Sequence, residues 1–409
     1  MKTTTIFLTL FFSLLIHQLS AQSWTQQTSG YDGNLYNVYF LNQDIGFVCG
    51  DNGNILKTVN GGSTWVSKNT GISEGLSCIQ FVSSNVGYAS SGFYEKYSTL
   101  IKTTDGGNTW SSTNVPALKT AGGMYFLNAK IGFYAYADGL YSNSVIARTI
   151  NGGANWDTVH IANGWVSYFH FPDSLHGFAT VNNGTVLKTV DGGQSWSTLN
   201  LPLSIWGSGI YFLNKDTGFV GGQPRNGLIS MYKTIDAGAN WTSIPSSNMI
   251  MKIFFSDNTN GYALTVDTSG TGTMIKSSTS GDSWTSESTP IDKLSGMFFL
   301  NNSLGYAIGD NGVILKYSNI SGIFNTELIS DKTTIYPNPV NNFISIKINK
   351  DNNEVFKMDI YNVSGKLVRS QILKNSLQQI NISDLSNGIY MVEIKSKSGS
   401  EKQKLIIQR

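Results

Sequence analysis

The sequence has few charged residues for its length. Asp, Glu, Lys and Arg together make up 13% of the 409 residues, and the formal net charge is only +2. That share is low for a globular protein. A chain without a basic stripe or an acidic tail is a poor electrostatic partner for a phosphate backbone, so we expect no nucleic-acid partner. Two cysteines are also too few for a disulfide scaffold or a zinc cluster, and we expect no metal and no cofactor.

Long apolar runs are missing as well. A membrane-spanning helix needs about 20 apolar residues, and no segment reaches that length. The apolar run over residues 6–16 follows Lys2 and is followed by Leu19-Ser20-Ala21, a small-residue cleavage site. This arrangement is typical of a signal peptide. We therefore predict that residues 1–21 are a signal peptide, cleaved near Ala21, and that the mature chain has no transmembrane segment.

Glycine, at 43 residues, and aromatic residues, at 12%, are plentiful and follow a repeat. A glycine-aromatic pair stands six residues after each phenylalanine of the repeat. These phenylalanines recur every 41–45 residues, at Phe40, Phe81, Phe126, Phe171, Phe212, Phe255 and Phe299. Apolar-polar alternation between glycine turns predicts β-strands. A period of this length with four strand signals predicts a β-propeller.

A turn and a tryptophan close most repeats. Asn or Asp begins the turn, one or two glycines follow, and tryptophan stands five residues after the Asn or Asp. The Asn or Asp side chain can accept hydrogen bonds from local amides, and glycine supplies positive φ. We therefore assign a structural role to Asn60, Trp65, Asp105, Trp110, Asn151, Trp156, Asp191, Trp196, Asp236 and Trp241.

The seventh repeat has no tryptophan after Tyr317, but the start of the mature chain supplies one. Trp24 lies 16 residues before Phe40, which is the spacing of Trp65 from Phe81. We predict that the N-terminal strand completes the seventh blade, because such closure removes two sheet edges. The predicted fold class is all-β, with a seven-bladed propeller over residues 22–322.

The turn resembles the Asp-box, or bacterial neuraminidase repeat. The wider unit is similar to the photosystem II assembly-factor-like propellers, which share Gly-Phe, Lys-Thr and Asp-Gly-Gly-x-Thr-Trp. The resemblance implies the fold and not an activity. It also implies that the Asp-box aspartates are structural, and not catalytic.

The sequence gives little support for an enzymatic function. Sialidases of the Asp-box type use three arginines to hold the substrate carboxylate, whereas this propeller has only Arg148 and Arg225, so we disfavour that activity. Xyloglucanase-type glycoside hydrolases resemble two tandem propellers, and here there is one. Hydrolysis would need a pair of carboxylates, and nothing in the sequence pairs the candidate acids Glu95, Asp138, Asp267 and Asp292.

The cysteines and histidines do not predict a disulfide or a zinc site. Export would permit a disulfide between Cys49 and Cys78. Spacing does not decide whether they pair, and we favour two buried free thiols. The histidines of the mature chain match no zinc spacing. His170 stands at the repeat position of Tyr39 and is read as a packed replacement for an aromatic residue.

The best candidate for a ligand surface is the face opposite the Asp-box turns. Four repeats carry insertions of four or five residues between the second and third strands, and these loops rise on that face. Exposed aromatic residues there could stack on sugars or anchor a protein. The predicted ligand-binding residues are Trp165, Trp206, Tyr94, Tyr97, Tyr136, Tyr141 and Arg225. The alternative is that these rings only cover the bases of the loops.

A second domain follows a linker at residues 323–332. Alternating strands over residues 333–409 predict a small Ig-like β-sandwich. The order Tyr336-Pro337-Asn338-Pro339, Gly365-Lys366, Asn387-Gly388-Ile389-Tyr390 and a terminal basic-apolar strand resembles the type A sorting domain of type IX secretion. That resemblance implies the type IX machinery as a partner and a secreted or outer-membrane-surface location.

We therefore expect a monomeric exported propeller that binds a glycan or protein ligand. A binding protein is favoured over an enzyme. Two alternatives stay open, a secreted glycoside hydrolase with a carboxylate pair on the propeller face and a scaffold for protein assembly or adhesion.

Overall fold

The structure is a computed structural model and describes residues 22–91, 99–113, 115, 120–137, 143–202, 205–224, 229–246, 248–267, 269–319, 333–348, 355–362, 366–373, 377–396 and 399–409. The chain divides into two compact units between Ser321 and Gly322. The predicted signal peptide and the predicted linker lie outside the described residues. Within the described part, no helix has the length and apolarity needed to cross a membrane.

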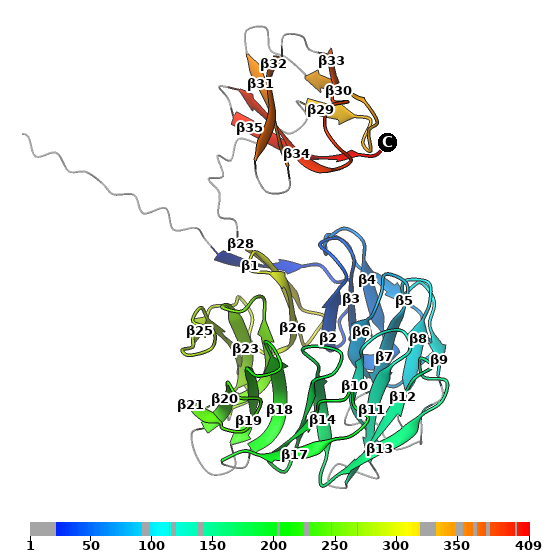
Figure 1. Ribbon diagram of the computed structural model, residues 1–409, viewed down its shortest axis with the longest axis vertical. Helices are drawn as coiled ribbons and strands as arrows, with labels where there is room; N and C mark the ends of the chain where they lie inside the picture. The colour runs from blue at the N-terminus through cyan, green and yellow to red at the C-terminus, as the bar shows by residue number, and fades with distance from the viewer. Residues whose placement is uncertain are drawn as a thin grey trace, which may run out of the picture. The chain divides into compact units, whose positions relative to one another are not determined.

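The first unit is a ring of blades around a common axis (Figure 1). Over the described residues it contains seven four-stranded antiparallel sheets. The inner strands are β2 (Leu35–Phe40), β6 (Leu76–Phe81), β10 (Thr120–Phe126), β14 (Val166–His170), β18 (Ile205–Phe212), β22 (Met249–Phe255) and β26 (Leu294–Asn301). The second strands are β3 (Gly46–Gly50), β7 (Gly87–Ser91), β11 (Gly132–Ala137), β15 (Gly177–Val181), β19 (Gly218–Pro224), β23 (Gly261–Val266) and β27 (Leu304–Gly309).

Two further strands complete each blade toward the outside. The third strands are β4 (Ile55–Thr58), β8 (Leu100–Thr103), β12 (Ser144–Thr149), β16 (Thr185–Thr189), β20 (Ile229–Thr234), β24 (Gly272–Ser277) and β28 (Ile314–Asn319). The outer strands are β5 (Val66–Lys68), β9 (Ser111–Ser112), β13 (Asp157–Ala162), β17 (Ser197–Asn200), β21 (Thr242–Pro245), β25 (Thr285–Glu287) and β1 (Gln22–Gln27). A single 3-10 turn, η1 (Asp51–Gly53), lies between β3 and β4.

The ring is closed by the N-terminal strand. Strand β1 pairs antiparallel with β28, which places Trp24 opposite Tyr317 and makes β1 the outer strand of blade seven. The predicted closure is therefore confirmed, and so is the predicted fold class. In the other six blades a turn joins the third strand to the outer strand. In blade seven the outer strand comes from the N-terminal end of the propeller instead.

Packing between blades explains the repeated glycine-aromatic pair. The ring of Phe40 lies against Gly46, where a Cβ would stand only 2.4 Å from the ring. The repeat phenylalanine also stacks on an aromatic ring of the preceding blade, as Phe126 does on Tyr88 with centroids 3.5 Å apart. The Asp-box Trp156 meets the Phe126 ring edge-on. The stacked pairs are Phe40–Tyr306, Phe81–Phe47, Phe126–Tyr88, Phe171–Phe133, Phe212–Phe178, Phe255–Phe219 and Phe299–Tyr262.

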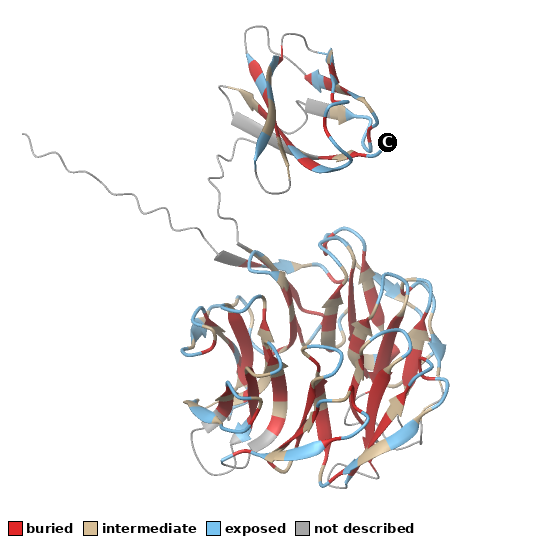
Figure 2. Cartoon of the chain, viewed as in Figure 1, coloured by how far each residue is buried: buried red, intermediate tan, exposed pale blue. Residues whose placement is uncertain are grey.

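These contacts place the propeller core between adjacent sheets. The second strands are buried along most of their length, the inner strands alternate between buried and half-buried residues, and the outer strands are largely exposed (Figure 2). Any atom added at a repeat glycine must therefore displace an aromatic ring that two blades share.

Replacing Gly177 with alanine tests this packing. The new Cβ would stand 2.2 Å from Phe171 Cε1, and the Phe171 ring stacks on Phe133 with centroids 4.8 Å apart. Overpacking of this kind lowers the free energy of unfolding by about 1–3 kcal/mol. Gly209→Ala is the control, because its Cβ would meet no heavy atom closer than 3.4 Å. Urea unfolding of both variants checks the prediction, and equal losses would contradict it.

In six of the seven repeats the cation forms a second link between blades. Lys57 Nζ donates to the Gly106 carbonyl oxygen in the Asp-box turn of the next blade, at 2.7 Å. Arg148 stands at the same repeat position and donates through Nε to the Gly192 carbonyl oxygen, at 3.2 Å. Arg148 therefore has the same structural contact as the lysines. The other pairs are Lys102–Gly152, Lys188–Ala237, Lys233–Ser280 and Lys316–Gly61.

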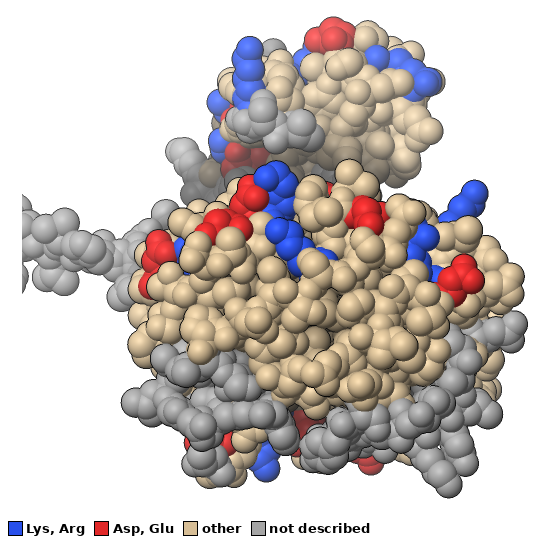
Figure 3. Space-filling view, turned by 60° about the horizontal axis from the view of Figure 1, so that its bottom comes forward, with Lys and Arg blue, Asp and Glu red and all other residues tan. Residues whose placement is uncertain are grey.

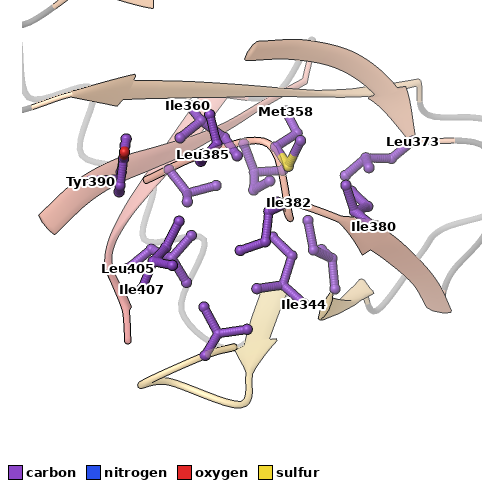
Figure 4. Packing of buried hydrophobic residues seen from close by; sticks show 14 of the residues in the cluster. Ile344, Met358, Ile360, Leu373, Ile380, Ile382, Leu385, Tyr390, Leu405 and Ile407 are labelled. Atoms are coloured by element: carbon purple, nitrogen blue, oxygen red, sulfur yellow. The ribbon is translucent and has the colours of Figure 1, made fainter. Parts of the chain in front are cut away.

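The second unit is a small β-sandwich. One sheet has the order β29 (Thr333–Tyr336), β30 (Phe343–Ile348) and β33 (Leu377–Asn381). The other has the order β32 (Leu367–Leu373), β31 (Phe356–Asn362), β34 (Gly388–Ser396) and β35 (Gly399–Ile407). Ile344, Met358 and Leu405 are fully buried among the apolar side chains that both sheets point inward (Figure 4).

The motifs at the two ends of the second unit meet in space. Asn338 Oδ1 accepts a hydrogen bond from the Ile406 amide at 2.9 Å, and the Val340 amide donates to the Ile406 carbonyl oxygen at 2.8 Å. Arg409 Nε donates to the Asn341 carbonyl oxygen at 3.1 Å. The Tyr-Pro-Asn-Pro segment and the residues directly after it therefore hold the last strand in place. This contact explains why the Tyr-Pro-Asn-Pro motif and the terminal basic-apolar strand occur in one domain.

Candidate functional site

The propeller encloses a cavity along its axis. Its volume is about 700 Å³, and the inner strand of every blade contributes to its lining. A cavity of this size is in the range of ligand pockets in general. Two sets of side chains on the inner strands differ in character and divide the cavity into two levels.

The first level is a ring of large side chains directly before each repeat phenylalanine, which we call the latch ring. Its members are Tyr39, Gln80, Tyr125, His170, Tyr211, Phe254 and Phe298. Tyr39 Oη donates to the Phe81 carbonyl oxygen of the next blade at 2.8 Å. Similar bonds run from Tyr125 to Phe171 and from Tyr211 to Phe255, at 3.3 and 3.0 Å. The latch ring holds blades together and lies toward the Asp-box turns, because each inner strand runs on into a loop that bonds such a turn.

Two members of the latch ring show how different residues fill the same role. Gln80 pairs with both backbone groups of Phe126, donating through Nε2 at 2.9 Å and accepting through Oε1 at 2.8 Å. His170 accepts a hydrogen bond from the Phe212 amide through Nδ1 at 3.2 Å and packs on Tyr211. Burial lowers the pKa of His170 to about 4, so the ring is neutral at pH 7. His170 therefore acts as a structural residue that joins two blades, and its contacts give no sign of a catalytic or metal-binding role.

The second level lies two residues earlier on each inner strand and is far less bulky. Its members are Asn37, Cys78, Gly123, Tyr168, Gly209, Lys252 and Gly296, and we call it the glycine level. A β-bulge stands at or beside this level in each blade. Three of seven positions have no side chain, so fewer side chains surround the axis here than at the latch ring, and residues of both levels line the cavity. Sequence reasoning missed this level, although the spacing from the repeat phenylalanines could have shown it.

Lys252 is the charged group of the glycine level. Its Nζ donates to the Tyr36 carbonyl oxygen at 3.0 Å, and burial lowers the pKa of the ammonium. The described residues that line the cavity include no Asp and no Glu. Across the described residues no group of three or more His, Cys, Asp and Glu could hold a metal ion.

The two cysteines lie near the same level as free thiols. Cys49 is buried, and Cys78 lines the cavity. Burial raises the pKa of Cys78 to about 11 and raises that of Cys49 further above its ordinary value. Both groups are therefore thiols at pH 7, and neither has the thiolate that nucleophilic chemistry requires.

The Asp-box residues lie in the turns between third and outer strands. Asp105 Oδ1 accepts from the amides of Asn108 and Thr109 at 3.0 and 2.9 Å, and its Oδ2 accepts from Thr109 Oγ1 at 2.6 Å. The hydrogen bonds from Thr109 hold the pKa of Asp105 well below its usual range. Equivalent amide bonds reach Asn60, Asn151, Asp191 and Asp236. Trp65, Trp110, Trp156 and Trp196 meet their repeat phenylalanines edge-on, and Trp241 packs in the same cluster as Phe212.

The aromatic residues predicted for the ligand face differ from expectation where they are described. Trp165 is only 3% exposed, and its backbone is held by hydrogen bonds to Asn182. Tyr136 is 8% exposed and packs in the core between blades two and three. The expectation that these two rings stand exposed was wrong, because the blades cover both Trp165, which directly precedes β14, and Tyr136, which lies on β11.

The other predicted ligand residues belong to the loop insertions. Tyr94, Tyr97, Tyr141 and Arg225 lie outside the described residues. Trp206 lies on β18, opposite Gln223, and its side chain is also outside the described part. Their role in binding stays a prediction.

The candidate acids are not brought together at the cavity. Glu95 and Asp138 lie outside the described residues. Asp267 closes a tight turn, where its Oδ1 accepts from the amides of Ser269 and Thr271. Asp292 is exposed.

Two families match the chain over separate segments. Residues 16–167 match the photosynthesis system II assembly factor YCF48, and residues 334–408 match the secretion system C-terminal sorting domain. The sorting domain marks the protein for type IX secretion, to the cell surface or the outside. No curated protein matches the chain.

Solved structures agree on the propeller. YCF48 bound to D1 peptide is similar with a TM-score of 0.59 at 18% identity, covering 73% of this chain and 98% of that one. YCF48 from Cyanidioschyzon merolae has a TM-score of 0.58 at 19% identity, covering 73% and 99%. The GH74 enzyme of Niastella koreensis has a TM-score of 0.58 at 13% identity, covering 95% and 75%. At these identities the likeness establishes the fold alone.

Proposed function

We propose that this secreted propeller, of the YCF48 type and joined to a sorting domain, is a binding protein that takes a glycan or protein ligand in its axial cavity. The observation that supports this most is the cavity itself, which measures about 700 Å³, lies between seven inner strands and is lined by residues of both the glycine level and the latch ring. Ligand sites are concave and mostly preformed, with a few polar groups that fix orientation.

The two levels give the cavity a direction. Because the latch ring lies toward the Asp-box turns, a ligand enters from the opposite face, past the linkers between blades. The insertions with Tyr94, Tyr97, Tyr141 and Arg225 stand in the sequence between second and third strands, and the described ends of those strands lie on that same face. These residues are the proposed outer contacts, and the glycine level is the proposed inner contact.

The surface charge favours neither nucleic acid nor another strongly charged polymer. On the face shown in Figure 3, uncharged residues cover most of the surface, and the charged side chains of both signs are scattered. A polymer of one charge would need a patch of the opposite charge. The YCF48 structure is named for a bound peptide, which supports a protein or peptide ligand for a propeller of this type.

A pair of phenylalanine variants of the full chain tests the proposal. Ser77 lines the cavity on the inner strand of blade two, and Ser112 lies exposed on the outer strand of the same blade. A panel of oligosaccharides and peptides is screened by thermal shift, since a ligand at 100 times its Kd stabilises by about 2.7 kcal/mol. Ser77→Phe should abolish the shift and Ser112→Phe should keep it. A shift that Ser77→Phe leaves unchanged would place the ligand elsewhere.

A further inference from the structure

Lys252 stands between two blades that have glycine at its repeat position. It belongs to the inner strand of blade six, and the same position is Gly209 in blade five and Gly296 in blade seven. A Cβ on Gly209 would lie 3.4 Å from Lys252 Cα, so the backbone of blade five runs directly beside the lysine. With glycine on both sides, the side chain reaches past blade seven to the Tyr36 carbonyl oxygen of blade one.

The ammonium of Lys252 is incompletely bonded by the protein. Its bond to Tyr36 uses one of three N–H donors. The carboxylate of Asp51 in blade one has other partners, since its Oδ1 accepts from Tyr36 Oη and its Oδ2 accepts from the Asn34 amide at 3.0 Å. No carboxylate is found among the described residues that line the cavity.

The other groups around the lysine are neutral. Cys78 is a thiol, His170 is an uncharged imidazole, and Asn37 is an amide. A buried charge without a counter-ion is costly, so an anion that enters the cavity gains a charge-assisted hydrogen bond at this point. The cavity therefore has an electrostatic reason to prefer an anionic group.

We propose that Lys252 binds the terminal carboxylate of a peptide that enters the cavity, an inference that rests on the proposed function. A free terminal carboxylate is the anionic group that an unmodified peptide carries whatever its sequence, and it can accept the hydrogen bonds that Lys252 Nζ has left to donate. Tyr168 and Met251 also line the cavity and offer apolar surface for the last side chains. A sugar acid would instead bring several hydroxyl donors to a lining that lacks carboxylate acceptors over its described residues.

The test compares two peptide pools on the full chain. One is a pool of N-acetylated tripeptides with free carboxylates, and the other is the same pool with C-terminal amides. Binding is measured by saturation-transfer NMR and calorimetry. The free acids should bind the wild type about 10-fold or more tightly than the amides, as expected for a hydrogen bond to a charged group. Lys252→Met should remove this preference, and Lys252→Arg should keep most of it.

Controls separate the possible failures. Lys215→Met removes the same charge from an exposed ion pair with Asp216 and should leave the preference intact. The inference is overturned if acids and amides bind alike, if Lys252→Met keeps the preference, or if neither pool binds. It is also overturned if trigalacturonic acid binds more tightly than the acid peptides. If Ser77→Phe abolishes binding of both pools while acids and amides bind alike, the proposed function stands and only the role of Lys252 fails.

Discussion

Replacing Trp24 with alanine is expected to lower the free energy of unfolding of the propeller by about 3–5 kcal/mol, the usual cost of removing a buried tryptophan. Trp24 is 8% exposed and is the side chain through which the N-terminal strand enters the core. Its ring lies 5.9 Å from that of Phe299 and 5.1 Å from that of Tyr317. Its Nε1 donates to Glu287 Oε1 in blade six at 3.3 Å.

The effect should reach beyond the lost contacts, because no short turn joins β1 to its partner β28. Trp110→Ala is the matched control, since Trp110 meets Phe81 with the same geometry, but its strand follows β8 through a short turn. Denaturant unfolding measures the free energy, and hydrogen exchange reports on the edge of blade seven. In Trp24→Ala the amides of β28 should lose protection, and in Trp110→Ala they should not. Equal protection of β28 in both variants would show that closure does not depend on Trp24.

The second large effect is a loss of stability in acid that depends on His170. Its pKa is about 4 in the folded protein and near 6.5 in an unfolded chain. Between these values the unfolded state binds the additional proton, so protonation favours unfolding as the pH falls. The contribution is fully present above pH 6.5 and is lost between pH 6.5 and 4. A shift of this size corresponds to about 3 kcal/mol.

His170→Gln isolates this contribution from other titrating groups. Gln80 shows that glutamine fits the latch ring, where it pairs with both backbone groups of the next blade. The variant should match the wild type at pH 7 to within about 1 kcal/mol and exceed it at pH 4. Urea unfolding at half-unit steps of pH supplies both curves. Parallel curves for the two proteins would mean that His170 is accessible to protons in the folded state.

The repeat made the architecture predictable. Phe40 and its six equivalents fix the blade count, and the distance from Trp24 to Phe40 fixes the closure. The reason is physical, since every repeat phenylalanine must find both a glycine and a ring of the preceding blade. Because all seven blades need this packing, the phenylalanines and glycines recur in the sequence at a regular interval. Such a repeat can be recognised from the sequence alone.

The candidate site left no such signal. The glycine level varies from blade to blade, and Lys252 occurs in it once, so no repetition marks it. The burial of Trp165 was missed for a related reason. This tryptophan is outside the repeat, so no equivalent residue in another blade shows which way its side chain points. What distinguishes one propeller from another is the part that does not repeat, and it becomes visible only when the seven inner strands are placed around one axis.

Closure by β1 also has a consequence for the order in which the chain is made. The strand synthesised first finds its partner last, since Thr25 Oγ1 donates to the carbonyl oxygen of Lys316, 291 residues later. Until that partner has emerged, blade seven lacks its outer strand, and a contact between such distant residues forms slowly. A propeller closed in this way stays open until its seventh blade has been synthesised, so the ring cannot lock while the earlier blades are being made.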